Sequence, residues 1–341
     1  MKYSHRFFLY APVAVVVALA VAAGTYWSIS ANAFSRRLDA LNGHEVAPGV
    51  TFSFASKSIS GFPFRIDAVL KDMSVNVATT HGEAGWRTEN FALHMLDYRG
   101  EQFVFEAAGN QLVSWRDKYR VAHAIKFVPG LMRASAIAGD GRLKRVDLQL
   151  IGAAVPSLTV ARTELHLRRD PNADALDVAF MADGVHLSPD LRTAWGDVIS
   201  KIRLNALLTP AESWNALLSG TGDWRSAAEQ WRTRSGTLTI AQLEIAWGKV
   251  NASGSGELRL DDSRRPQGLI KLQIANFHAL ADAAAGRHLI KGAQAGVLSG
   301  LMLEAASADR ESAGRLPVTL AFKDGLAYVG QTPTGFLDPV Y

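Results

Sequence analysis

The chain begins with a long apolar run, residues 7–29, that carries no charged side chain. A helix of about 20 apolar residues crosses a hydrocarbon core of roughly 30 Å, so this run predicts one transmembrane helix. Lys2 and Arg6 precede the run, and basic residues are retained on the cytoplasmic side of membrane helices. We expect residues 1–31 to form a cytoplasmic stub and a signal anchor. The chain would then cross the inner (cytoplasmic) membrane once, with its body in the periplasm.

A cleaved signal peptide is the alternative interpretation of this segment. Ala31-Asn32-Ala33 has the small residues at alternate positions that signal peptidases accept, which would place cleavage after Ala33. Tyr26 and Trp27 favour an uncleaved anchor, because aromatic side chains with a polar atom are enriched where a membrane helix meets water. In either case we expect the body to lie outside the cytoplasm.

The charge balance argues against nucleic acid as a partner. The 341 residues include 36 Lys and Arg and 32 Asp and Glu. Lys2 and Arg6 lie in the stub, which leaves 34 basic against 32 acidic residues in a nearly neutral body. Nucleic-acid binding requires a clustered basic surface instead. The sequence has no cysteine, which excludes disulfides, thiolate metal sites and a cysteine nucleophile.

Alternating apolar and polar residues recur along the whole body. A period of two directs one row of side chains toward an apolar interior and the other toward water, as in a half-buried β-strand. Polar turn residues separate these segments, which favours antiparallel meanders over parallel βαβ units. Asp324-Gly325 is a strong signal for a hairpin turn. The alternating segments include residues 50–55, 62–67, 73–77, 91–95, 146–150, 165–167, 176–180, 202–208, 243–247, 258–260, 272–274 and 318–322.

Helical periodicity is confined to a few places. Apolar residues at i, i+3, i+4 and i+7 from Trp224 predict a helix with Asp223 as its N-cap. Residues 278–305 are also compatible with helix. The predicted fold is mainly β: an elongated, curved antiparallel sheet with a few packed helices, preceded by one transmembrane helix. The expected parts of the chain are the anchor at 1–31, a strand-rich part at 32–210, a helical insertion at 211–235 and a second strand-rich part at 236–341.

No residue pattern predicts catalysis. Gly220-x-Gly222 and Gly254-x-Gly256 lack the third glycine of a dinucleotide-binding loop, and we interpret both as turns. The nine histidines are scattered singly, without the spacing of metal ligands. Asp261-Asp262 and Arg264-Arg265 are interpreted as solvated loop charges. We therefore predict a non-enzymatic protein with no catalytic residue, no metal site and no cofactor.

Gly61-Phe62-Pro63-Phe64-Arg65 is the most distinctive short string in the chain. Pro63 cannot donate to a strand ladder, so it fits the start or the edge of a strand, with Gly61 in a bend. Phe62 and Phe64 would share one face, and Arg65 would pair with Asp67 on the other. We interpret the string as a structural corner of the sheet, with a ligand contact as the alternative.

The alternating strands carry more apolar surface than the few predicted helices cover. Uncovered apolar surface beside a membrane is typical of a lipid-facing groove. We predict that such a groove binds or passes a lipid or another acylated envelope molecule, and that it is lined by Phe62, Phe64, Ile66, Leu148 and Leu204. The alternative is a structural protein with a covered apolar face that scaffolds a complex of protein partners in the cell envelope.

Several segments resemble a family of anchored periplasmic proteins from alphaproteobacteria, the domain-of-unknown-function family numbered 2125. With the anchor, they are residues 61–65, residues 240–277 including Leu243-Glu244-Ile245-Ala246-Trp247-Gly248, and Leu316-Pro317-Val318 with Asp324-Gly325. The resemblance covers nearly the whole chain and implies no reaction or catalytic residue. The anchor, the alternating strands and Gly254-x-Gly256-x-Leu258 are also similar to AsmA-like envelope proteins. That similarity implies lipid handling between the two membranes of Gram-negative cells.

Overall fold

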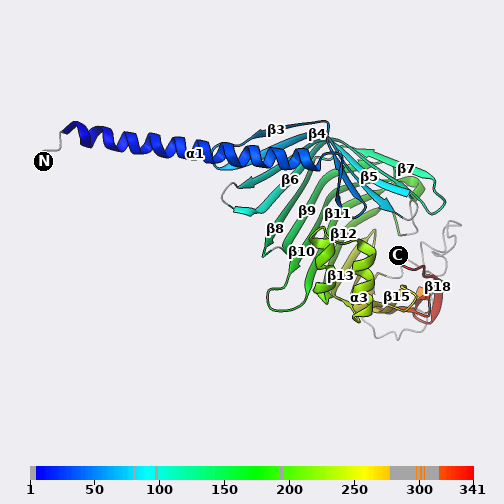
Figure 1. The fold of residues 1–341 in the computed structure, drawn as a ribbon. Helices are drawn as coiled ribbons and strands as arrows, with labels where there is room; N and C mark the ends of the chain where they lie inside the picture. The colour runs from blue at the N-terminus through cyan, green and yellow to red at the C-terminus, as the bar shows by residue number, and fades with distance from the viewer. Residues whose placement is uncertain are drawn as a thin grey trace. The chain divides into compact units, whose positions relative to one another are not determined.

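The computed structural model describes residues 5–79, 82–96, 99–140, 142–191, 195–276 and 315–341, together with the single residues 297, 300, 301 and 303 (Figure 1). Strands make up 61% of the chain, which confirms the mainly β prediction. The chain divides into two compact units, Met1–Ala124 and Ile125–Tyr341. The predicted helical insertion lies inside the second unit.

Helix α1 (His5–Leu41) begins the first unit and extends well beyond the apolar run. Val13–Leu41 is long and apolar enough to cross a membrane. The helix therefore continues ten residues past the predicted end of the anchor at residue 31, into the part that was expected to be rich in strands. Ala31 is buried within this helix. The small residues of the predicted cleavage sequence, Ala31-Asn32-Ala33, therefore lie within a continuous helix.

The strands of the first unit form an antiparallel ladder. Strands β2 and β3 both pair with β4, β1 pairs with β2, β4 pairs with β5, and β5 pairs with β6. Strand β4 begins at Arg65, so Pro63 lies in the turn before the strand, whereas the sequence pattern had placed it at the start or edge of the strand. The strands are β1 (His44–Ala47), β2 (Val50–Ser53), β3 (Ser56–Ser60), β4 (Arg65–Thr79), β5 (Gly82–Leu96) and β6 (Arg99–Arg116).

The core of the first unit joins helix α1 to this ladder. Leu38 from the last turns of the helix is buried with Phe54, Ala68, Leu70 and Met73. The alternation along β4 directs its apolar residues toward the helix, because every second side chain of a strand points to the same face. The C-terminal part of α1 is therefore a structural element of the folded body as well as an extension of the anchor.

The strands of the second unit follow one another as an antiparallel meander. Each strand from β8 to β18 pairs with the next along the chain, and β7 (Ala122–Phe127) lies at the boundary of the two units. The strands are β8 (Leu131–Gly139), β9 (Arg142–Val155), β10 (Leu158–Arg169), β11 (Leu176–Leu187), β12 (Val198–Thr209), β13 (Thr237–Trp247), β14 (Val250–Leu260), β15 (Pro266–Ala275), β16 (Arg315–Lys323), β17 (Leu326–Val329) and β18 (Thr332–Phe336).

Two turn predictions have different outcomes. Lys323 pairs with Leu326 across Asp324 and Gly325, which both have a positive φ, so the predicted tight hairpin is confirmed. Gly254 and Gly256, in contrast, lie in the middle of β14 and not in a turn. The prediction was wrong there because a glycine pair marks a turn only where the neighbouring strand pattern is interrupted.

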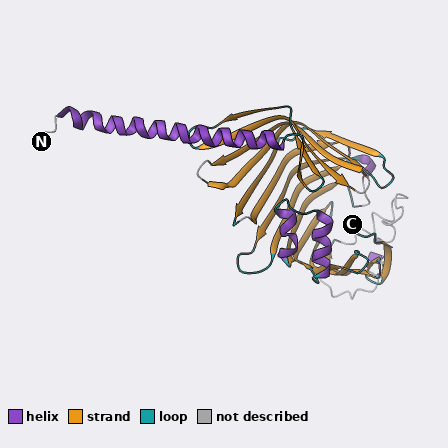
Figure 2. Cartoon of the chain, in the orientation of Figure 1, coloured by secondary structure: helices purple, strands orange, loops and turns teal. Residues whose placement is uncertain are grey.

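Helices η2, α2 and α3 of the second unit pack on one end of its sheet (Figure 2). Asp223 caps α3 as predicted, since its side chain accepts a hydrogen bond from the Ser226 amide. Trp214 and Trp231 are buried there against apolar side chains of the strands. The helices are η1 (Pro189–Leu191), η2 (Ala211–Trp214), α2 (Asn215–Leu218) and α3 (Trp224–Thr233).

The second predicted helical region, residues 278–305, lies for the most part outside the described residues. The four residues that are described within it, Val297, Gly300, Leu301 and Leu303, are helical. Leu301 is buried against Ile274, Leu316 and Val318 of the sheet. This part of the region therefore packs on the same sheet as predicted.

Candidate functional site

One face of the second unit's sheet carries apolar side chains in register across many strands. Leu148, Leu165, Phe180, Leu204 and Leu243 are successive cross-strand partners from β9 to β13. Cross-strand partners point to the same face of a sheet. The parallel row two residues along contains Val146, Leu167, Val178, Ala206 and Ile240. We call the surface formed by these two rows the apolar face.

The apolar face is only partly covered by the described residues. Ala206, Ile240 and Ile270 are buried at its floor, and Leu204, Leu243 and Leu272 pack around them while remaining partly exposed. Leu148 has 41% of its surface exposed. These side chains therefore present an apolar surface to whatever lies above them.

The two ends of these strands are covered by different elements. At one end, Trp214 and Trp231 pack on Leu208 and Leu238. At the other end, Leu301 packs with Ile274 and Leu316. Among the described residues, the helices around Trp214 and Trp231 and the segment around Leu301 thus cover the two ends of β12 to β16. The row through Leu204 and Leu243 lies between these two covered ends.

The opposite face of the same strands is polar, and its charges are paired. Arg162 binds Glu164 at 2.6 Å, Arg203 binds Asp183 at 2.6 Å, and Lys201 binds Glu244 at 2.8 Å. The hydrogen bond from Arg162 lowers the pKa of Glu164, and the hydrogen bond from Lys201 lowers the pKa of Glu244. Each carboxylate has its own cation, so this face offers no uncompensated charge at these positions.

The structure places the five predicted groove residues in different environments. Leu148 and Leu204 lie in one cross-strand row of the apolar face. Ile66 is fully buried in the first unit, so its side chain packs inside protein and does not line an open surface. Phe62 and Phe64 are exposed in the turn between β3 and β4 of the first unit. Alternation with a period of two predicts on which side of a strand a residue lies. It does not predict whether another element covers that side.

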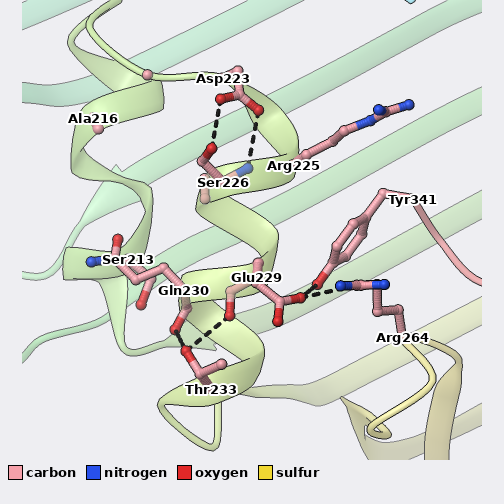
Figure 3. A pocket seen from close by; sticks show the side chains of 12 residues that line it. Ser213, Ala216, Asp223, Arg225, Ser226, Glu229, Gln230, Thr233, Arg264 and Tyr341 are labelled. Atoms are coloured by element: carbon pink, nitrogen blue, oxygen red, sulfur yellow. Dashed lines mark hydrogen bonds and ion pairs between the residues drawn. The ribbon is translucent and has the colours of Figure 1, made fainter. Parts of the chain in front are cut away.

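The second unit also has an open pocket of about 810 Å³ beside helix α3 (Figure 3). Glu229 lies at its centre and accepts hydrogen bonds from Tyr341 Oη at 2.7 Å, Arg264 Nε at 3.1 Å and Arg232 Nη2 at 2.8 Å. Hydrogen bonds from Arg232, Tyr341 and Arg264 lower the pKa of Glu229 to about 2. Burial and the hydrogen bond to Glu229 raise the pKa of Tyr341.

The contacts in this pocket hold Tyr341 in place, and the lowered pKa of Glu229 does not suit general acid–base catalysis. Arg264 also lies over the Tyr341 ring, at 5.5 Å from its centroid, and Arg232 pairs with Asp262. A general acid or base works best with a pKa near the working pH, and that of Glu229 lies far below neutrality. Asp262 is fully exposed in its turn, as predicted for a solvated loop charge, whereas Arg264 is half-exposed and is held by Glu229 and the Tyr341 ring. No sequence signal relates Glu229 to Tyr341, because 112 positions separate them.

Metal binding finds no support among the described residues, where no group of three His, Asp or Glu side chains comes together. His94 bonds Asp67 at 2.7 Å, and His123 bonds Asp117 at 3.0 Å. These two histidines therefore have separate carboxylate partners. The polar contacts of the site thus orient protein groups, and the apolar face remains the candidate binding surface.

Comparison with known proteins identifies one family. The model of the family described as "Uncharacterized protein conserved in bacteria (DUF2125)" matches residues 27–337. The match begins inside helix α1 and includes both units. No curated protein and no solved structure matches the chain.

Proposed function

The chain belongs to this family of proteins conserved in bacteria, and we propose that it is a membrane-anchored protein that holds acyl chains of a lipid, or of another acylated envelope molecule, on its apolar face. The observation that carries the proposal is the row of partly exposed apolar side chains from Leu148 to Leu243. A soluble surface rarely keeps so many adjacent apolar side chains without a partner.

The dimensions of the apolar face fit an acyl chain. Neighbouring strands are about 4.8 Å apart, so the row from Leu148 on β9 to Leu272 on β15 is about 29 Å long. One acyl chain spans half of a hydrocarbon core, or about 15 Å. Burying about 300 Å² of apolar surface would contribute about 7.5 kcal/mol at 25 cal/mol per Å². This exceeds the lower estimates, about 4 kcal/mol, of the entropy lost on association.

The proposed role is non-enzymatic. Binding of an acyl chain requires an apolar surface and no reacting group. On the opposite face Arg162 pairs with Glu164 and Lys201 pairs with Glu244, and in the pocket Arg264 pairs with Glu229. We also propose that the protein works at the bacterial inner membrane in the manner of AsmA-like envelope proteins. The anchor and the β-rich body support this assignment.

The proposed orientation puts the body in the periplasm. Lys2 and Arg6 precede the apolar run, but Arg36 and Arg37 follow it within a few residues. The positive-inside rule compares the two flanks of a membrane helix, and these basic residues are balanced with two on each flank, so the orientation is decided by experiment. A reporter that is active only in the cytoplasm, fused after Tyr341, should be silent; strong activity would reverse the orientation.

The lipid proposal is tested by a pair of charge substitutions on one strand. Leu204→Glu puts a carboxylate on the apolar face, and Asn205→Glu puts the same charge one residue on, on the polar face. Lipids would be extracted from the full chain purified in mild detergent and quantified by mass spectrometry. We expect Leu204→Glu to lose a specific lipid that the wild type and Asn205→Glu retain.

The comparison between variants is needed because any membrane anchor carries bulk lipid with it. Bulk lipid around α1 is the same in both variants, so only a difference counts. Circular dichroism and tryptophan fluorescence confirm folding, and Leu204→Ala provides a milder variant if the charged one unfolds. Equal lipid recovery from all four proteins would contradict the proposal and favour a scaffold for a cell-envelope complex.

A further inference from the structure

We propose that the turn between β3 and β4 inserts Phe62 and Phe64 into the lipid bilayer beside helix α1, as a second membrane contact. Phe62 is 58% exposed and Phe64 is 70% exposed. Both lie in the turn that precedes β4, with Pro63 between them. Two exposed phenylalanines at the tip of a hairpin, with one residue between them, are costly in water, whereas lipid would accept them.

The turn lies directly against the membrane helix. The Phe62 ring packs edge-on to the Trp27 ring, with centroids 5.6 Å apart and an interplanar angle of 89°. It also approaches Gly24, where an added Cβ would lie 3.7 Å from the ring. Trp27 Nε1 donates a hydrogen bond of 2.8 Å to the carbonyl oxygen of Arg65. The helix and the turn therefore touch through both apolar and polar contacts.

The contact lies at the depth where the membrane should end. An α-helix rises 1.5 Å per residue, so Trp27 lies about 3 Å and Gly24 about 8 Å inside the end of the apolar run at Ile29. Interfacial segments bury their apolar side chains about 5–10 Å into the boundary between headgroups and acyl chains. Trp27 is also of the residue type that prefers this boundary. Because Phe62 contacts helix α1 at this depth, its neighbour Phe64 should enter the lipid as well.

Contacts further along α1 hold the hairpin in this position. Lys57 on β3 donates to the carbonyl oxygen of Ser35 at 2.6 Å and pairs with Asp39 at 2.6 Å. At the start of β4, just after the turn, Asp67 binds Arg65 at 2.8 Å and His94 at 2.7 Å. Leu38 fixes the same helix to the core of the unit. Two points of membrane contact on one rigid unit would set the tilt of that unit relative to the bilayer.

The chain has no cysteine, so a single label reports one position. Phe64→Cys would be labelled with the environment-sensitive fluorophore NBD in the full chain, reconstituted into vesicles of phosphatidylethanolamine and phosphatidylglycerol. Tyr119→Cys is the matched control, because Tyr119 is an exposed aromatic residue in a turn of the same unit. Tyr119 follows β6 near the end of the ladder where Ser114 pairs with Gly85 of β5. Arg65, next to Phe64, pairs with Leu96 at the opposite end of β5. Eleven residues of β5 separate the two ends by about 36 Å.

We expect the label at position 64 to emit at shorter wavelength than the label at position 119 and to be quenched by lipids with a doxyl group near the top of the acyl chain. The label at position 119 should be quenched by aqueous iodide only. Equal emission and equal iodide quenching at both positions would overturn the proposal. A shifted emission at position 64 without doxyl quenching would also overturn it, because protein and not lipid would then cover the turn.

Discussion

Helix α1 is predicted to be an integral part of the folded body, and a pair of identical substitutions tests this. Leu38 is 6% exposed and lies in the core of the first unit, whereas Leu41, three residues later on the same helix, is 42% exposed. Leu→Ala removes the equivalent of about three methylene groups, worth about 0.8 kcal/mol each when fully buried. Leu38→Ala should therefore cost about 2.4 kcal/mol from transfer alone, and about 3 kcal/mol with the cavity it leaves.

The same arithmetic gives a much smaller cost at Leu41. Its remaining exposure scales the transfer loss to about 1.4 kcal/mol at most, and no enclosed cavity forms. The difference of about 1.5 kcal/mol or more corresponds to about a tenfold change in the unfolding constant. Urea unfolding of the full chain in detergent, followed by tryptophan fluorescence, measures this difference. Equal destabilisation by both substitutions would refute the claim that the end of α1 docks into the body.

Three further predictions follow from particular residues. Gly61→Ala should destabilise the first unit by about 1–3 kcal/mol in the same assay, because φ is +103° and the new Cβ would lie 2.6 Å from the Arg65 carbonyl oxygen; an unchanged midpoint would contradict this. Ile240→Ala should cost about 2–5 kcal/mol because the residue is buried, while Leu148→Ala should cost about 1 kcal/mol or less and act chiefly on lipid retention. The hydrogen bonds lower the pKa of Glu229 from 4.5 to about 2, so their stabilisation should be complete above about pH 5 and lost as the pH falls toward 2. The stability difference between wild type and Glu229→Gln should therefore be constant from pH 7 to 5 and shrink below that, and a difference that grew in acid would have the wrong sign.

The strand content and the two-faced character of the sheet were predictable from local pattern. Alternation at residues 202–208 and 243–247 requires one apolar and one polar face, and the observed register confirms it for Leu204 and Leu243. The helix at Trp224 and the turn at Asp324 were also predictable, because a cap and a hairpin turn depend on residues next to one another in the sequence.

Features that depend on distant contacts could not be predicted in this way. Ile66 and Leu148 have similar alternating surroundings in the sequence, yet Ile66 is 2% exposed and Leu148 is 41% exposed. The difference arises from which elements pack above each strand. The bond between Glu229 and Tyr341 and the contact between Trp27 and Phe62 likewise join segments far apart in the chain.

The most direct test of acyl-chain binding is photocrosslinking in a membrane. The full chain would be reconstituted with a phospholipid that carries a diazirine in its acyl chain, irradiated and digested, and the labelled peptides identified by mass spectrometry. The proposal predicts label on peptides containing Leu148, Leu165, Phe180, Leu204 or Leu243, in addition to helix α1. Label confined to α1 and to the turn at residues 61–64 would show that only the anchor and its neighbouring turn meet lipid, and would contradict the proposed function.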